Sequence, residues 1–184
     1  ESQTFSFDKS NPTIASGAIL TPISWEYIKW NNSYTITWNA GNITDNETLP
    51  ANPITLEYSS NNGTNWTVIS STLPNTGSYN WNVPNFSSTQ SKLRMKVRDN
   101  VWNESTYETT SSFVIDSQNP TFSITTGTPP NGAYINAGGF EALGTAGDNI
   151  KIDKIYYSFK RNSNTTYFNV STYTWAITWN LLQD

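Results

Sequence analysis

The sequence predicts an all-β chain of tandem β-sandwich modules, and three observations support this prediction. Several short segments alternate apolar and polar residues with a period of two, as expected for a strand with one buried face. Turn-forming residues separate these segments, and no segment has convincing helical periodicity. A stretch of ten residues also recurs later in the chain, which indicates repeated modules rather than one large fold.

The first module is predicted from its alternating segments, taken in chain order. The expected strands cover 13–20, 34–39, 54–59, 66–68, 79–83, 92–98 and 113–116. The most regular one carries Leu93, Met95 and Val97 on one face, and burial of each such side chain contributes about 1.5–3 kcal/mol. Its register is therefore strongly specified. About seven strands in a module of this length is the count of an immunoglobulin-like, Greek-key sandwich.

Two details of these strands are also predicted. Asn61-Asn62-Gly63 tolerates the positive φ of a tight hairpin turn, so 54–59 and 66–68 are expected to be neighbouring strands. The basic residues of 92–98 alternate with the apolar ones and form either a solvated strand face or a patch for an acidic partner. The solvated face is preferred, with Glu57 and Glu108 as expected cross-strand partners. The basic residues are Lys92, Arg94, Lys96 and Arg98.

The repeat defines the module boundaries. Residues 5–14 recur as residues 113–122, at an interval of 108 positions. Both copies contain Asp-x-x-Asn-Pro, where proline cannot continue a central strand. The predicted organisation is therefore 1–9 as the terminal strand of a preceding module or a linker, 10–117 as one sandwich, and 118–184 as a second sandwich. The second has expected strands at 140–145, 152–160, 167–170 and 173–179, nothing equivalent to 91–116, and so lacks its last two strands.

Composition restricts the function. The chain contains no cysteine and no histidine, so thiol chemistry and the commonest general base and metal ligand are missing. No carboxylate pair stands out as an acid–base couple, and we expect no enzyme activity and no resident cofactor. A net charge of −4 argues against nucleic acid binding. No apolar run is long enough to span a bilayer, and the polar start does not resemble a signal segment.

Several phrases carry a family resemblance. They are Tyr34–Trp38, Leu56–Ser59, Gly77–Trp81 and Val97–Ser105, with Gly144–Asn149 in the second module. The chain resembles bacterial immunoglobulin-like and fibronectin type III-like repeats over nearly its whole length. That resemblance implies an extracellular location, secreted or at the cell surface, and a role as a stalk, spacer or adhesive module. The chain departs from the family pattern at Val101-Trp102, where the Asp-Asn-x-Gly-Asn turn usually has glycine.

Aspartate and asparagine residues form a candidate calcium site, because Ca²⁺ prefers hard oxygen ligands. Asp-Asn pairs occur at Asp45, Asp99 and Asp148, and Asp8 and Asp116 lie at the predicted module ends. The preferred ligand set is Asp99, Asn100, Asn103 and Asp116, since a turn and a linker could converge at one end of the sandwich. The alternative is that these side chains cap turns without any metal.

Tryptophans form a second candidate site. Trp25, Trp30 and Trp102 do not fit the alternating core and could stack on sugar rings, because an indole presents a rigid apolar face. Packing between modules is the alternative use.

These observations lead to one preferred function and two alternatives. The preferred one is a structural or adhesive module that acts as a rod-like spacer, with neighbouring modules or identical subunits as partners. The first alternative is a carbohydrate-binding accessory module of a secreted polysaccharide-active enzyme, which would bind glycans. The second is a filament subunit in which the strand at 4–8 adds to the open edge of a neighbour's second module.

Overall fold

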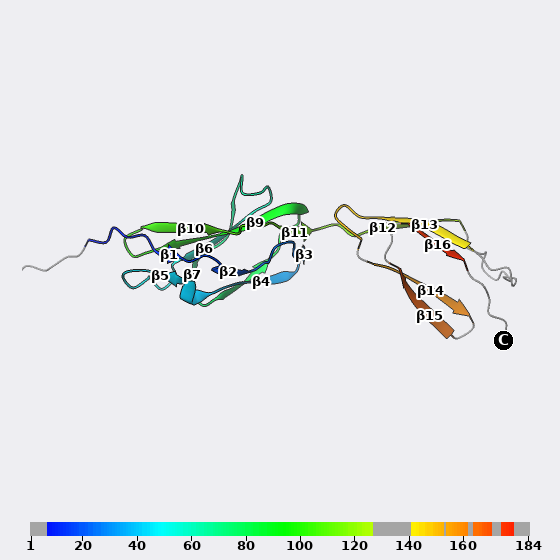
Figure 1. The fold of residues 1–184 in the computed structure, drawn as a ribbon, viewed down its shortest axis with the longest axis horizontal. Coiled ribbons are helices and arrows are strands. Elements are labelled where there is room, and N and C mark those ends of the chain that lie inside the picture. Colours follow the sequence, from blue (N-terminus) through cyan, green and yellow to red (C-terminus); the bar gives the residue numbers. More distant parts are fainter. Residues whose placement is uncertain (1–6, 127–140, 153, 162–163, 171–173, 179–184) are drawn as a thin grey trace, which may run out of the picture. The chain divides into compact units, whose positions relative to one another are not determined.

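The computed structural model describes residues 7–126, 141–152, 154–161, 164–170 and 174–178. The chain divides into two compact units, Glu1–Ser117 and Gln118–Asp184 (Figure 1). Among the described residues, regular structure is β-strand apart from one 3-10 turn, η1, at Ala40–Asn42. None of the described residues belongs to a helix with the length and apolarity needed to cross a membrane. The prediction of an all-β chain is confirmed.

The described residues of the first unit, 7–117, form eleven strands. They are β1 (Thr13–Ile14), β2 (Ile19–Thr21), β3 (Tyr27–Lys29), β4 (Ser33–Trp38), β5 (Ile43–Thr44), β6 (Ile54–Ser59), β7 (Thr67–Leu73), β8 (Ser78–Asn82), β9 (Ser88–Arg98), β10 (Glu104–Glu108) and β11 (Phe113–Asp116).

These strands form two main sheets. One sheet has the order β2-β4-β8, and the other has the order β3-β11-β9-β6-β7 with β10 paired to β9. A small pair, β1-β5, closes one end. The chain passes from β4 to β6, β8 and β9 by changing sheets at each step, which is the Greek-key connectivity of an immunoglobulin-like sandwich. Figure 1 shows β4 and β9 in the two separate layers.

The core lies between these sheets and contains the apolar residues that the alternation predicted. β4 contributes Ile36 and Trp38, and β9 contributes Leu93, Met95 and Val97, all at most 3% exposed. Side chains of β6, β8 and β11 complete the same buried cluster. The indole Nε1 of Trp38 donates to Asn75 Oδ1 at 2.9 Å, so its polar atom is satisfied inside the core.

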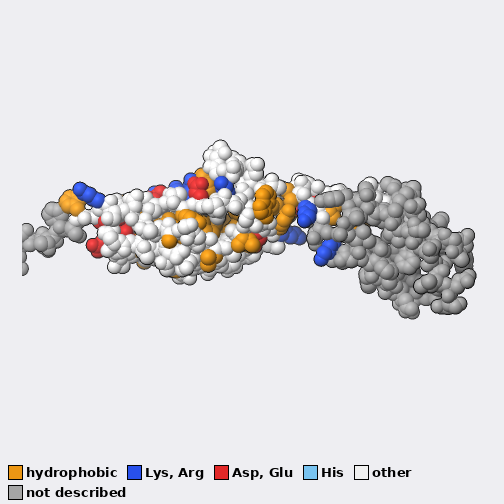
Figure 2. All heavy atoms as spheres, in the orientation of Figure 1, with side chains coloured by type: hydrophobic (Ala, Val, Ile, Leu, Met, Phe, Trp, Pro, Cys, Tyr) orange, Lys and Arg blue, Asp and Glu red, His pale blue; other side chains and the backbone are white. Residues whose placement is uncertain are grey.

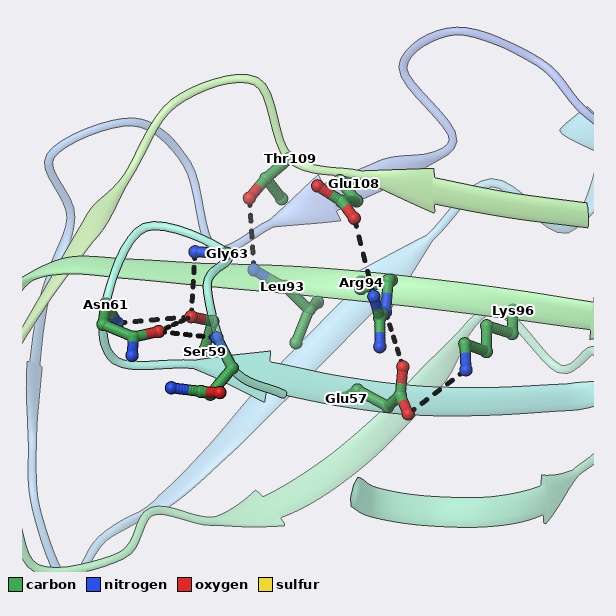
Figure 3. Close-up of polar contacts among 10 residues, drawn as sticks. Glu57, Ser59, Asn61, Gly63, Leu93, Arg94, Lys96, Glu108 and Thr109 are labelled. Carbon is green, nitrogen blue, oxygen red and sulfur yellow. Dashed lines mark hydrogen bonds and ion pairs between the residues drawn. The ribbon is translucent and has the colours of Figure 1, made fainter. Parts of the chain in front are cut away.

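The predicted hairpin between β6 and β7 is confirmed, with antiparallel pairing of the two strands. Asn62 and Gly63 have positive φ values of 55° and 89°. The buried Ser59 hydroxyl donates to Asn61 Oδ1 and accepts from the Gly63 N–H, both at 2.9 Å. This turn and the neighbouring ion pairs are drawn in Figure 3.

Arg94 and Lys96 on the basic face of β9 pair with acidic residues of the neighbouring strands, as predicted. Arg94 Nε lies 2.6 Å from Glu57 Oε2, and Lys96 Nζ lies 3.5 Å from Glu57 Oε1 (Figure 3). Glu108 on β10 approaches the same arginine at 3.7 Å. The Arg94 guanidinium also stacks over the Trp66 ring, 4.2 Å from its centroid. A role of this face in binding an acidic partner is therefore less favoured, because Arg94 and Lys96 already pair with acidic residues of the same sheet.

The second unit repeats the first half of this topology. Its strands are β12 (Thr121–Thr126), β13 (Glu141–Gly147), β14 (Ile155–Arg161), β15 (Asn164–Val170) and β16 (Thr174–Thr178). β12-β13-β16 corresponds to β2-β4-β8, and the hairpin β14-β15 corresponds to β6-β7. The described part of this unit contains no equivalent of β9 or β11.

Three details of the first unit differ from the sequence prediction. The expected opening strand at 13–20 is two short strands, β1 and β2, and each pairs with a different partner. β3 pairs in parallel with β11, and β10 pairs with β9; neither strand was predicted. The predicted strand at 1–8 lies mostly outside the described residues, and Phe7 and Asp8 are not in a strand.

Candidate metal centre

Three aspartates converge at one end of the first unit. Asp8, Asp45 and Asp99 each offer one carboxylate oxygen, and these oxygens lie within 4.8 Å of one another. Asp8 precedes β1, Asp45 directly follows β5, and Asp99 directly follows β9. Segments far apart in the sequence therefore supply the three charges.

Strand pairing and one amide hold these segments together. β1 pairs with β5 through Thr13 and Thr44, which brings the residues before β1 close to those after β5. The Asn103 side-chain amide donates to the Ser10 carbonyl at 3.1 Å and approaches the Asp8 carbonyl at 3.5 Å. The chain entering the unit is thereby fastened to the β9–β10 turn.

Asp99 is fixed by its own turn. It is 6% exposed, and its Oδ1 accepts from the backbone N–H groups of Val101 at 2.9 Å and Asn103 at 2.8 Å. Its Oδ2 accepts from Asn103 Nδ2 at 2.6 Å. These three hydrogen bonds leave the Asp99 carboxylate little rotational freedom.

Asp45 has the opposite environment. Both of its carboxylate oxygens are buried, and neither has a hydrogen-bond partner among the described residues. Burial of an ionised carboxylate without a partner is costly, and such atoms in a folded protein require an explanation, for example an ion or water.

The cluster also lacks a counter-charge. None of the ion pairs found in the described part of the chain involves Asp8, Asp45 or Asp99. Two unit charges about 4.8 Å apart repel by roughly 3.5 kcal/mol at an effective dielectric constant of about 20. Three such charges in one place therefore favour a bound cation.

The ligand set predicted from the sequence is brought together only in part. Asp99 and Asn103 are in contact, as described. The Asn100 side chain bonds a different segment, because its Nδ2 donates to the Thr48 carbonyl at 2.7 Å. That bond ties the β9–β10 turn to the loop that follows Asp45.

Asp116 does not join the cluster. It ends β11, which runs antiparallel to β9, and the Ser87 hydroxyl lies 3.5 Å from its Oδ1. β9 separates this position from Asp99 and has eleven residues, which span about 33 Å. In the structure, Asp8 and Asp45 lie beside Asp99 in place of Asp116. The sequence analysis named both as possible oxygen donors but left them out of the preferred ligand set.

Asp148 caps a turn in the second unit. Its Oδ1 accepts from the N–H groups of Ile150 at 2.8 Å and Lys151 at 3.0 Å. This is the turn-capping use that was the alternative to metal binding.

The three tryptophans proposed for sugar stacking do not form one platform. The Trp30 N–H donates to the Asp116 carbonyl, and the Trp25 N–H donates to the Ser112 carbonyl. Trp102 lies in the β9–β10 turn at the other end of β9, where Arg98 stands over its ring at 5.4 Å. Trp25 and Trp102 are 66% and 75% exposed. Figure 2 shows hydrophobic side chains scattered over the visible face of the first unit, most of which is neither acidic nor basic.

One titratable group outside the cluster is strongly perturbed. Burial raises the pKa of the Tyr34 phenol, and a hydrogen bond and the negative charge of Glu26 raise it further. The phenol therefore stays protonated and serves as a donor between β4 and the loop before β3, which is a structural role.

Comparisons with known proteins do not identify a family for this chain. No protein-family model matches the chain, and no curated protein matches it. A solved structure of the FN1-FN3 domains of chicken CNTN1 is similar at 12% sequence identity with a TM-score of 0.35. The match covers 93% of this chain and 56% of that chain. The assignment of an immunoglobulin-like sandwich therefore rests on the strand order and register of the chain itself.

Proposed function

We propose that the first unit is a structural spacer module of a secreted or cell-surface repeat protein. The observation that carries this proposal is that the chain enters and leaves the unit at opposite ends. Asp8 and Ser10 are fastened to the β9–β10 turn, whereas Ser117 bonds the Ser87 hydroxyl just before β9. A module with this arrangement adds length to a chain of modules. The extracellular location comes from the resemblance to bacterial repeats described above.

The strand pairing suits a module under tension. β3 lies near the start of the unit and β11 is its last strand, and the two pair in parallel. Tension applied at the two chain ends reaches β3 after β1 and β2 have separated from β5 and β4, and it then pulls β3 and β11 in opposite directions along their length. Their hydrogen bonds are then loaded together rather than one after another. The bonds flanking the ladder include Trp25 N–H to Ser112 at 2.9 Å, Val114 N–H to Glu26 at 2.8 Å and Trp30 N–H to Asp116 at 3.0 Å.

Single-molecule stretching of the full chain tests this role. Tethered by its two ends, the first unit is expected to unfold in one main step, because its parallel pair breaks as a whole. The extension gained is roughly 35 nm, from about 3.3–3.6 Å per residue over the unit. Gradual lengthening without a distinct step would contradict the spacer function.

A substitution at Trp30 tests the parallel pair itself. Trp30→Pro removes the N–H that donates to Asp116, whereas the matched control Trp30→Ala removes the same indole and keeps the N–H. One hydrogen bond contributes about 1 kcal/mol. At constant force, the lifetime of the folded proline variant should therefore be about one fifth of that of the alanine variant. Equal lifetimes would show that β3–β11 does not bear the load.

A further inference from the structure

We propose that Asp8, Asp45 and Asp99 bind a calcium ion at the entry end of the first unit. The proposal is independent of the spacer function, because it concerns the cluster alone. The first step is the buried carboxylate of Asp45, whose two oxygens have no hydrogen-bond partner among the described residues. An Asx turn cannot explain this group, since neither oxygen caps a backbone N–H.

The second step is the geometry of the three carboxylates. Ca²⁺ takes about six to eight oxygen ligands at about 2.3–2.6 Å, so two oxygens on opposite sides of it are about 4.6–5.2 Å apart. The three carboxylate oxygens lie within 4.8 Å of one another, which this shell accommodates. Asp45 supplies two oxygens and Asp8 and Asp99 supply at least one each, so that water completes the shell.

The third step is the choice of cation. Mg²⁺ requires near-octahedral ligands at about 2.0–2.1 Å and gives up its water reluctantly, so it is seldom held by a group of protein carboxylates. The chain has no histidine or cysteine, which the softer transition metals prefer. Calcium is the common divalent cation whose chemistry fits carboxylates alone.

The ion would add a direct link between three segments that already meet through the β1–β5 pairing and side-chain amides. Asp8 belongs to the entering chain, Asp45 to the loop after β5, and Asp99 to the β9–β10 turn. Asn46 already donates to Asp8 at 3.3 Å, and Asn103 links the entering chain to Asp99. Calcium therefore stiffens the point at which the chain enters the sandwich.

Thermal unfolding of the full chain tests this site, with Asp45→Asn as the variant and Glu47→Gln as the matched control. Glu47 is exposed in the same loop, and its substitution removes the same charge as that of Asp45. With 10 mM CaCl₂ in place of EDTA, Tm of the wild-type first unit should rise by roughly 5–10 °C, given a Kd of about 10⁻⁴ M. The same rise is expected for Glu47→Gln, and none for Asp45→Asn. An equal concentration of MgCl₂ should shift Tm by less than about 2 °C.

The order of stabilities without calcium distinguishes ion binding from a structural role. In EDTA, Asp45→Asn should melt at or above the wild-type Tm, because an amide replaces a buried, repelled charge. In CaCl₂ the order should reverse. Titration calorimetry should give one Ca²⁺ per wild-type chain at this site and at least tenfold weaker binding for Asp8→Asn, which alters the entering chain outside the core.

Three results would overturn the proposal. They are an unchanged wild-type Tm in CaCl₂, an equal shift in MgCl₂, and a calcium response of Asp45→Asn equal to that of the wild type.

Discussion

Leu93→Ala is expected to lower the free energy of unfolding of the first unit by about 2–5 kcal/mol. Leu93 lies in the middle of β9, is 0% exposed, and contacts a core shared by both sheets. Its truncation removes apolar burial and leaves a cavity that the surrounding strands fill only in part. Urea denaturation, followed by the fluorescence of the buried tryptophans, measures this change.

Leu20→Ala is the matched control for that substitution. The residue type and the deletion are the same, but Leu20, the middle residue of β2, is 51% exposed. Its replacement should change the free energy of unfolding by less than about 0.5 kcal/mol. Similar losses from both variants would show that β9 does not supply the inner face of the sandwich.

Glu57→Ala is expected to cost about 2–4 kcal/mol of unfolding free energy. Glu57 is 7% exposed and bonds both Arg94 and Lys96 from the neighbouring strand. Loss of one partner of a buried pair leaves the other charge without compensation. The loss of unfolding free energy should be smaller than the largest values known for buried pairs. The Arg94 side chain is 18% exposed, and Glu108 remains as a second acidic partner.

An exposed ion pair on the same strand is the control. Arg98 and Glu104 also pair, but the Arg98 side chain is 51% exposed. Glu104→Ala should therefore cost no more than about 1 kcal/mol in urea denaturation, and 0.5 M NaCl should reduce that cost. A loss for Glu57→Ala as small as this one would contradict the role of Glu57 as the buried partner of the basic face.

Alternation was sufficient to predict the strands that bury a face. β4, β6 and β9 each place apolar side chains in the core at every second residue. β3 and β10 were missed for a physical reason. β3 has three residues and buries one of them, Ile28, and β10 is polar and buries none. Both are held by backbone pairing to β11 or β9, and backbone pairing leaves no pattern of side-chain hydrophobicity.

The sequence selected carboxylate and amide oxygens near the module ends, and the structure brings together a different set of aspartates. Asp99 was chosen correctly as a turn aspartate, yet Asp116 was placed beside it. β9 and β11 are antiparallel neighbours, so the residues that follow them lie at opposite ends of the sandwich. That rule excludes Asp116 from the neighbourhood of Asp99, whereas Asp8, its equivalent one repeat earlier, is placed there by contacts with Asn103 and Asn46. Asp45 could not be placed from the sequence, because the β1–β5 pairing that positions it involves strands of two residues.

A distance across the first unit tests the central claim, that the chain enters and leaves at opposite ends. The chain has no cysteine, so Ser10→Cys and Asn85→Cys provide the sole sites for a pair of spin labels. Ser10 marks the entry, and Asn85 lies two residues before Ser87, which bonds Ser117 at the exit. Pulsed electron spin resonance should give a single distribution centred at roughly 30–45 Å, the length of β9 plus the labels. A centre below about 20 Å would place both chain ends on one side of the sandwich and contradict the spacer function.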